Sequence, residues 1–211
     1  MRRVLAKHHW PQPDAGGPSW LTFIGHTKDS LWSVDLFRCE SITLKTYWVL
    51  VVMDQFTRRI IGFAVHAGPV DGMALCFMFN TAIARGDLPK YLSSDNDPLF
   101  TYHRWLANLR ILEIDELKTV PYTPVSHPFV ERLIGSIRRE LLDQVFFWNT
   151  VDLERKLRSF QLHFNHSRTH ASLNGNTPAE VSDNVVTHPA ALRNFTWEKH
   201  SGGLFELPVA A

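Results

Sequence analysis

The chain has 211 residues with an apolar fraction of 45%, enough for one sizeable domain plus extensions, and its formal net charge of +1 gives no compositional sign of nucleic-acid binding. Its two cysteines, Cys39 and Cys76, lack the spacing of a metal site, which argues against a disulfide framework and favours a reducing, cytoplasmic location. The sequence also lacks the apolar core of a secretory signal and the roughly 20 apolar residues of a membrane-spanning helix.

The first 66 residues are predicted to form a leader and then three strands. Residues 1–30 are rich in proline and glycine without periodicity, so we expect an extended leader or linker. Runs of apolar and β-branched residues then predict strands at residues 31–38, 47–53 and 59–66. The connection at residues 54–58 is short, which predicts that the second and third strands form a hairpin.

The rest of the chain alternates between helix and strand patterns. Residues 70–85 have helical spacing of apolar side chains, whereas three prolines within residues 119–128 exclude a regular helix there. The other predicted elements are strands at residues 91–94 and 111–117, helices at residues 100–109, 129–147 and 151–164, and a short strand within residues 202–209. Three strands followed by alternating helices and strands predict an α/β fold with a mixed sheet.

An aspartate interrupts the first predicted strand. Alternate residues of the run 31–37 point to opposite faces, and both faces are mostly apolar, as expected for a central strand. An ionised Asp35 is costly there unless it is paired or bound to a metal ion. The alternative is an aspartate in a structural hydrogen bond or at an earlier strand end.

Two further acidic residues lie at the ends of predicted elements. Asp95 follows the strand at residues 91–94, where a fixed backbone can aim its side chain, although a structural Asx turn would also explain it and Asp97 competes for the same role. Glu131 lies in the first turn of a predicted helix, where the helix dipole alone favours a glutamate. Gly135 on the same helix face leaves room beside this carboxylate.

Carboxylates brought together from separate elements repel one another unless a cation holds them. Asp35, Asp95 and Glu131 therefore predict a divalent-metal site with oxygen ligands. Such a site can activate an oxygen nucleophile against a phosphodiester. Three histidines within residues 163–170 are also close in sequence, but they suit a hard cation such as Mg²⁺ less well than oxygen ligands do.

Basic residues accompany the acidic ones. Arg132, Arg138 and Arg139 follow Glu131 on one helix, and Lys156 lies on the next. These side chains could hold DNA phosphates without reading base sequence. The alternative is an ordinary solvated charged face.

The order of the acidic motifs, with thirty-five residues between Asp95 and Glu131, resembles the catalytic core of the retroviral integrase superfamily. The sequence is most similar to bacterial insertion-sequence transposases with an integrase core. The resemblance covers about residues 30–181. The stretches that carry it are Trp32–Asp35, Val52–Arg58, Ser94–Phe100, Glu131–Glu140 and His170–Glu180.

The resemblance implies a ribonuclease-H-like fold with a central mixed five-stranded sheet flanked by helices. The catalytic core would occupy residues 31–168, and residues 169–211 would form a C-terminal extension. Asp35, Asp95 and Glu131 would be the catalytic and metal-binding residues of a DDE transposase, with two Mg²⁺ ions that Mn²⁺ could replace. The implied reaction is DNA strand cleavage and strand transfer between element ends and target DNA, by a homo-oligomer assembled on DNA.

Two other functions stay open at this point. One is a ribonuclease-H-like nuclease that cuts RNA in hybrids or branched DNA, and the other is a catalytically silent DNA-binding remnant of a mobile element. The sequence also departs from the family in two ways. Asp97 stands where many relatives have glycine, and residues 1–30 are too short for the helix-turn-helix region that usually precedes the core.

Overall fold

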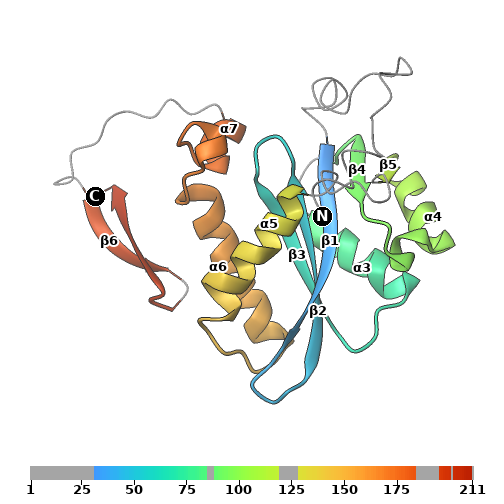
Figure 1. The fold of residues 1–211 in the computed structure, drawn as a ribbon, viewed down its shortest axis with the longest axis horizontal. Helices are drawn as coiled ribbons and strands as arrows, with labels where there is room; N and C mark the ends of the chain where they lie inside the picture. Colours follow the sequence, from blue (N-terminus) through green and yellow to red (C-terminus); the bar gives the residue numbers. More distant parts are fainter. Residues whose placement is uncertain (1–30, 85–87, 119–127, 184–194, 201, 211) are drawn as a thin grey trace, which may run out of the picture.

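The structure is a computed structural model that describes residues 31–84, 88–118, 128–183, 195–200 and 202–210. The predicted leader at residues 1–30 and nearly all of the predicted loop at residues 119–128 lie outside the described residues. A central sheet stands between two groups of helices, and a small hairpin follows at the C-terminal end (Figure 1).

The central sheet has five strands in the order β3-β2-β1-β4-β5. β1 pairs antiparallel with β2, and β2 pairs antiparallel with β3, so the predicted hairpin is confirmed. β4 pairs parallel with both β1 and β5, which makes the sheet mixed as predicted. The strands are β1 (Leu31–Glu40), β2 (Thr46–Asp54), β3 (Ile60–Ala67), β4 (Tyr91–Ser94) and β5 (Asp115–Lys118).

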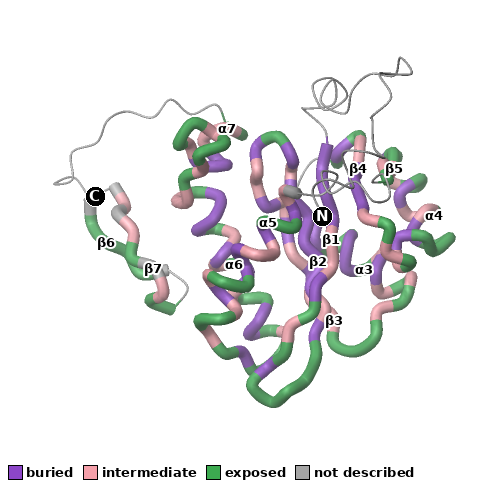
Figure 2. The backbone as a smooth tube through the Cα atoms, in the orientation of Figure 1, coloured by how far each residue is buried: buried purple, intermediate pink, exposed green. Residues whose placement is uncertain are grey.

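The two faces of the sheet carry separate cores. Trp32, Val34 and Leu50 point to the face that α3 and α4 cover, whereas Phe37 and Val51 point to the face that α5 and α6 cover. All five side chains are buried, as the central strands in Figure 2 indicate. Asp35 shares the parity of Phe37, so it lies on the α5 face.

The four predicted helices are present with different bounds, and the structure adds α7, which the sequence did not predict. The structure has α3 (Gly72–Ile83), the 3₁₀ turn η1 (Pro98–Thr101), α4 (His103–Ile111), α5 (Pro128–Ile137), the π-helical turn η2 (Arg138–Leu142), α6 (Thr150–His166), the 3₁₀ turn η3 (Ala171–Leu173) and α7 (Pro178–Asp183). The single helix predicted at residues 129–147 is wrong in its second half, because a π turn begins at Arg138 and the chain then leaves the helix. The amide of Asp143 donates to the carbonyl of Arg138 at 2.8 Å, which closes this wider turn.

Two strand predictions also need correction. The strand predicted at residues 111–117 begins only at Asp115, since Ile111 still belongs to α4. The short strand predicted within residues 202–209 is present as β7 (Phe205–Ala210), but it pairs with β6 (Phe195–His200), which the sequence did not predict.

A side-chain amide ties α6 to β3 where the strand pairing is irregular. The register between β2 and β3 shifts between Val52 and Met53, and Met53 is the partner of Ile60. Asn165, which is 4% exposed, accepts from the Ile60 amide at 2.9 Å and donates to the Ile60 carbonyl at 2.9 Å. On the other face Gly62 allows α3 to approach closely, because a Cβ there would overlap the carbonyl oxygen of Ala82.

Among the described residues, no helix has both the length and the apolar character that crossing a membrane requires.

We expect Asn165→Ala to lower the free energy of unfolding by about 2–4 kcal/mol, because it leaves the buried Ile60 amide without its acceptor. Urea denaturation measures the loss. Asn80→Ala is the matched control, because Asn80 is exposed and its side chain pairs with that of Asn108 through exposed hydrogen bonds, so its effect should stay within about 0.5 kcal/mol. Equal losses in both variants would show that Asn165 does not hold α6 on the sheet.

Candidate active site

The parallel pairing of β1 with β4 aligns two of the predicted acidic residues. Ser33 of β1 lies opposite Ser93 of β4. Asp35 and Asp95 each lie two residues beyond this pair, so they are in neighbouring segments at the same end of the two parallel strands. Asp35 remains inside the strand, where it pairs with Val51 of β2, and its carboxylate accepts from the Leu36 amide at 2.7 Å.

The loop after β4 separates Asp95 from its competitor Asp97. Asp97 is the N-cap of η1, and its carboxylate accepts from the Leu99 amide at 2.8 Å. Asp95 accepts from the Asp97 amide at 3.0 Å, so the Asx turn considered for it is present. Each aspartate thus has a local structural role, and Asp95 lies closer along the chain to the end of the strand.

The third acidic residue comes from the helix that covers this face of the sheet. Val130, Leu133 and Ile137 of α5 are buried against β1 and β2, which fixes the helix on the sheet. Glu131 lies in the first turn of α5 and is exposed. No other residue of the described first turn of this helix is acidic.

These acids act on one another electrostatically. The pKa of Asp35 is raised to about 7, chiefly by burial and in smaller part by the negative charges of Asp95, Glu131 and Asp97, while the hydrogen bond from the Leu36 amide acts in the opposite direction. The structure therefore places these three carboxylates within range of the Asp35 charge. Among the described residues, however, no three His, Cys, Asp or Glu side chains are close enough to form a metal-ligand cluster. The three histidines within residues 163–170 therefore do not form a metal-ligand cluster either.

The carboxylates nevertheless have the chemistry that a hard divalent cation requires. Their donor atoms are oxygens, which Mg²⁺ and Mn²⁺ prefer. The raised pKa of Asp35 means that the ionised form lacks a compensating positive charge. A cation at this end of the strands would supply that charge, so the residues fit such an ion.

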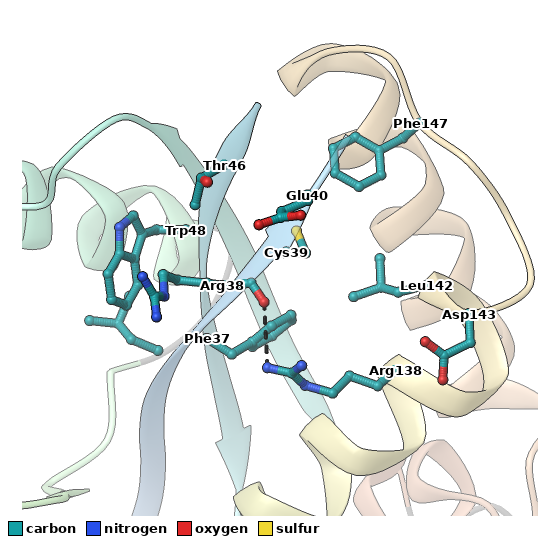
Figure 3. A pocket seen from close by; sticks show the side chains of 11 residues that line it. Phe37, Arg38, Cys39, Glu40, Thr46, Trp48, Arg138, Leu142, Asp143 and Phe147 are labelled. Atoms are coloured by element: carbon teal, nitrogen blue, oxygen red, sulfur yellow. Dashed lines mark hydrogen bonds between the residues drawn. The ribbon is translucent and has the colours of Figure 1, made fainter. Parts of the chain in front are cut away.

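The four predicted DNA-binding residues fall into three places. Arg132 and Arg139 line a cavity of about 720 Å³ that Glu131 also lines. Arg138 lies in a different cavity, where it donates to the carbonyl oxygen of Arg38 at 3.4 Å (Figure 3). Lys156 on α6 is engaged in an ion pair with Asp152, so its charge is largely offset.

Sequence reasoning missed the other basic residues beside Glu131. Arg58, Arg168 and His170 line the same cavity as Arg132 and Arg139. Arg58 ends the turn between β2 and β3, and Arg168 and His170 follow α6. Both segments lay in or beside stretches that resemble the integrase family, and that similarity was the available signal.

Comparison with known proteins gives a consistent result. Two family models, both described as integrase core domain, match residues 25–124 and 113–178. A 39.2 kDa protein of insertion element IS476 from Xanthomonas euvesicatoria is 26% identical over 159 residues, which cover 75% of this chain and 46% of that protein. A 31.7 kDa protein of insertion element IS407 from Burkholderia multivorans is 21% identical, with 73% and 55% covered. The chain thus spans about half the length of these curated relatives.

A solved structure has the same fold. The HTLV-2 integrase catalytic core domain, in complex with magnesium and in a dimeric form, aligns with a TM-score of 0.56 at 17% identity. The alignment covers 73% of this chain and 95% of that domain. The five-stranded mixed sheet with helices on both faces is therefore a ribonuclease-H-like α/β fold, as predicted.

We expect Asp35→Asn to stabilise the metal-free protein at pH 8 but not at pH 4. The folded state holds the Asp35 proton up to about pH 7, whereas the unfolded chain releases it near 3.8, so this group lowers stability as the pH rises between these values. Removing it should raise the free energy of unfolding by about 2–4 kcal/mol at pH 8. Urea denaturation in EDTA at both pH values measures the effect.

Asp71→Asn provides a control of opposite sign. Asp71 caps α3 by accepting from the Met73 and Ala74 amides, and these hydrogen bonds hold its pKa below the usual range. Its stabilising contribution is present at pH 8 and is lost as the pH falls through that lowered pKa, so the variant should gain nothing at pH 8. If Asp35→Asn also gained nothing at pH 8, the charge on Asp35 would not be destabilising.

Proposed function

We propose that this chain, which belongs to the integrase core family, is the catalytic part of a transposase that cuts and joins the DNA strands of an insertion element. The family consists generally of polynucleotidyl transferases that depend on divalent metals. The activity, the substrates and the partners of the whole protein are part of this proposal, because the chain spans about half of its curated relatives.

The observation that supports the proposal is the electrostatic effect of acids from two other elements on the Asp35 carboxyl. Asp35 comes from β1, Asp95 from the loop after β4 and Glu131 from α5. The charges of Asp95 and Glu131 both act on the Asp35 carboxyl and raise its pKa. A protein that retains such repulsion within a central strand gains nothing in stability from it, which favours a functional explanation.

The proposed cofactor is a pair of Mg²⁺ ions, for which Mn²⁺ could substitute. Asp35, Asp95 and Glu131 are the residues that would hold them. When bound, the ions would supply Lewis-acid activation of the attacking oxygen and charge neutralisation at the leaving oxygen. The exposed position of Glu131 in the first turn of α5 leaves its carboxylate accessible for this role.

The proposed reaction is a hydrolysis followed by a transesterification, both at phosphorus. In cleavage, a water oxygen bonds to phosphorus while the bond to the 3′-oxygen breaks, and the 3′-oxygen leaves with a proton. In joining, the oxygen of that 3′-hydroxyl bonds to a phosphorus of the target DNA and gives up its proton, while the bond from this phosphorus to the target's own 3′-oxygen breaks and that oxygen leaves with a proton. One ester bond thus replaces another, and no nucleoside triphosphate is consumed. The rigid strand β1 would keep Asp35 aligned with the reacting phosphate through both steps.

The remaining proposals concern organisation. Residues 31–168 would form the catalytic core and residues 169–211 an extension. Joining two element ends requires more than one active site, so we propose a homo-oligomer on DNA; the HTLV-2 domain, which has the same fold, has both a dimeric and a trimeric form in complex with magnesium. Action on a bacterial genome would place the protein in the cytoplasm.

We expect Asp35→Asn, Asp95→Asn and Glu131→Gln each to reduce Mg²⁺-dependent cleavage and joining by at least about a thousandfold, because the acids act as one unit. Incubation with labelled element-end DNA, scored for nicked and joined products, measures this. Asp115→Asn is the control, because Asp115 is exposed on β5 and should leave activity unchanged.

The same assay separates the alternatives. Cleavage of RNA–DNA hybrids without strand joining would indicate a ribonuclease-H-like nuclease instead. DNA binding without any metal-dependent cleavage would indicate a silent remnant, provided that the assay is run on a protein that also carries the regions present in its longer relatives. Full joining activity in Asp35→Asn would contradict the assignment of the acidic site.

We also expect Mg²⁺ and Mn²⁺ to raise the melting temperature of the wild-type protein at pH 8 and to have no effect on the double variant Asp35→Asn, Asp95→Asn. A cation that binds only the folded state stabilises it by mass action, by about 2.7 kcal/mol at a hundred times its dissociation constant. Thermal unfolding with and without each ion measures this. An equal shift in the double variant would place the ions elsewhere.

A further inference from the structure

The cavity beside Glu131 is basic. It has a volume of about 720 Å³ and lies between α5 and the segment that follows α6. We call it the basic cavity. Arg168 in its wall is paired with Glu140 at 2.6 Å, so its charge is offset. Within the described part of the chain, no ion pair offsets the other three arginines in its wall, which are Arg58, Arg132 and Arg139.

Arg58 is the most unusual of these residues. Its Nε and Nη1 atoms are buried and have no hydrogen-bond partner among the described residues. Its guanidinium carbon lies 3.2 Å from the centroid of the Phe129 ring. The pKa of Arg58 is lowered to about 10, chiefly by burial and in smaller part by the charge of Arg132, while the charge of Asp54 acts in the opposite direction. A buried donor without a partner is destabilising, which calls for an explanation.

The backbone holds Arg58 in this position. The carboxylate of Asp54 accepts from the Phe56 amide at 2.7 Å and the Thr57 amide at 3.3 Å, which makes a tight Asx turn. The Asp54 amide donates to the Arg59 carbonyl at 2.9 Å and closes the hairpin. Arg58 itself has φ of +62°, a strained conformation for a residue with a side chain. Strain of this kind persists where the surrounding structure positions a functional group.

The loop that follows α6 also contributes to the basic cavity. The His170 amide donates to the Asn176 carbonyl at 3.1 Å, and the Gly175 amide donates to the His170 carbonyl at 3.0 Å. This closed loop holds the His170 ring 4.8 Å from that of Phe164, with its Nε2 buried and without a partner in the described residues. The loop therefore presents a second unsatisfied polar group to the basic cavity.

We propose that the basic cavity binds a backbone phosphate of the DNA strand that reacts at the neighbouring acids. The identity of this ligand rests on the proposed function. Phosphate oxygens accept the hydrogen bonds that Arg58 lacks, and guanidinium groups match phosphate geometry. Three unpaired arginines face one carboxylate there, Glu131, so the net charge suits an anion.

The proposal gives α5 and the following η2 two tasks. Glu131 in the first turn of α5 acts on the Asp35 carboxyl through its charge, and Arg139 of η2, about two turns later, lines the basic cavity with Glu131. Gly135 lies between them, and a Cβ at this position would come within 3.1 Å of Arg139 Nη1. A phosphate held in the cavity would thus lie beside the scissile phosphodiester and fix the register of the strand without reading its bases.

The test is DNA binding without metal. Fluorescence anisotropy in EDTA, with a labelled DNA duplex of arbitrary sequence, should show a five- to tenfold weaker affinity for Arg58→Gln, with the slope of log affinity against log salt reduced by about 1. Arg58→Lys, which keeps the charge but loses the planar donors, should fall between wild type and Arg58→Gln. Arg110→Gln is the matched control, because Arg110 is exposed on α4 across the sheet and should bind as wild type does.

Arg132→Gln guards against misfolding of Arg58→Gln, since Arg132 is exposed and lines the same cavity. Far-UV circular dichroism and melting temperature check each variant. Unchanged affinity and salt slope in Arg132→Gln and in folded Arg58→Gln would overturn the proposal. An equal loss in Arg110→Gln would overturn it too, because binding would then follow overall charge. A wild-type protein that binds DNA in this way but never cleaves it would count against the proposed function alone.

Discussion

The parallel pairing of β1 with β4 is the constraint on which the acidic site depends. β1 joins an antiparallel hairpin on one side to the parallel strands on the other, so its register is set twice. A slip of one residue would turn Asp35 from the α5 face to the α3 face and place Val34 or Leu36 among the acids instead. The apolar residues of β1 on both faces make that slip costly, because it would expose Trp32 and Phe37 to the wrong core. Core packing thus fixes the position of a carboxylate that itself contributes no stability.

Negative and positive groups without compensating partners lie on either side of α5. On one side the buried Asp35 carboxyl is repelled by Asp95 and Glu131. On the other side Arg58 has buried donors without partners in the described chain and is repelled by Arg132. A protein without ligands would leave both imbalances uncompensated, and a cation together with a DNA phosphate would offset them at once. This arrangement accounts for why two features that each cost free energy lie next to each other.

Local patterns were sufficient for most of the sheet and for the acidic residues. The β-branched runs placed β1, β2 and β3 to within about two residues, and the burial of both faces of β1 marked Asp35 as exceptional. The errors occurred where tertiary contacts override local pattern. The helix from residue 129 ends early because a π turn begins at Arg138 and lets Phe147 enter the core beside Tyr47. The pairing of β6 with β7 was equally invisible in the sequence.

The sequence by itself determined the α/β class, the ribonuclease-H-like resemblance and three acids at the ends or in the middle of predicted elements, because these depend on residue type and short-range periodicity. Only the tertiary structure decided which charges meet. It separated Arg138 from Arg139, paired Lys156 with Asp152, and brought Arg58 and His170 to the cavity of Glu131 from segments more than a hundred residues apart. The physical reason is that electrostatic interactions act through space over a few ångströms, and the neighbours of a charge are set by packing rather than by distance along the chain.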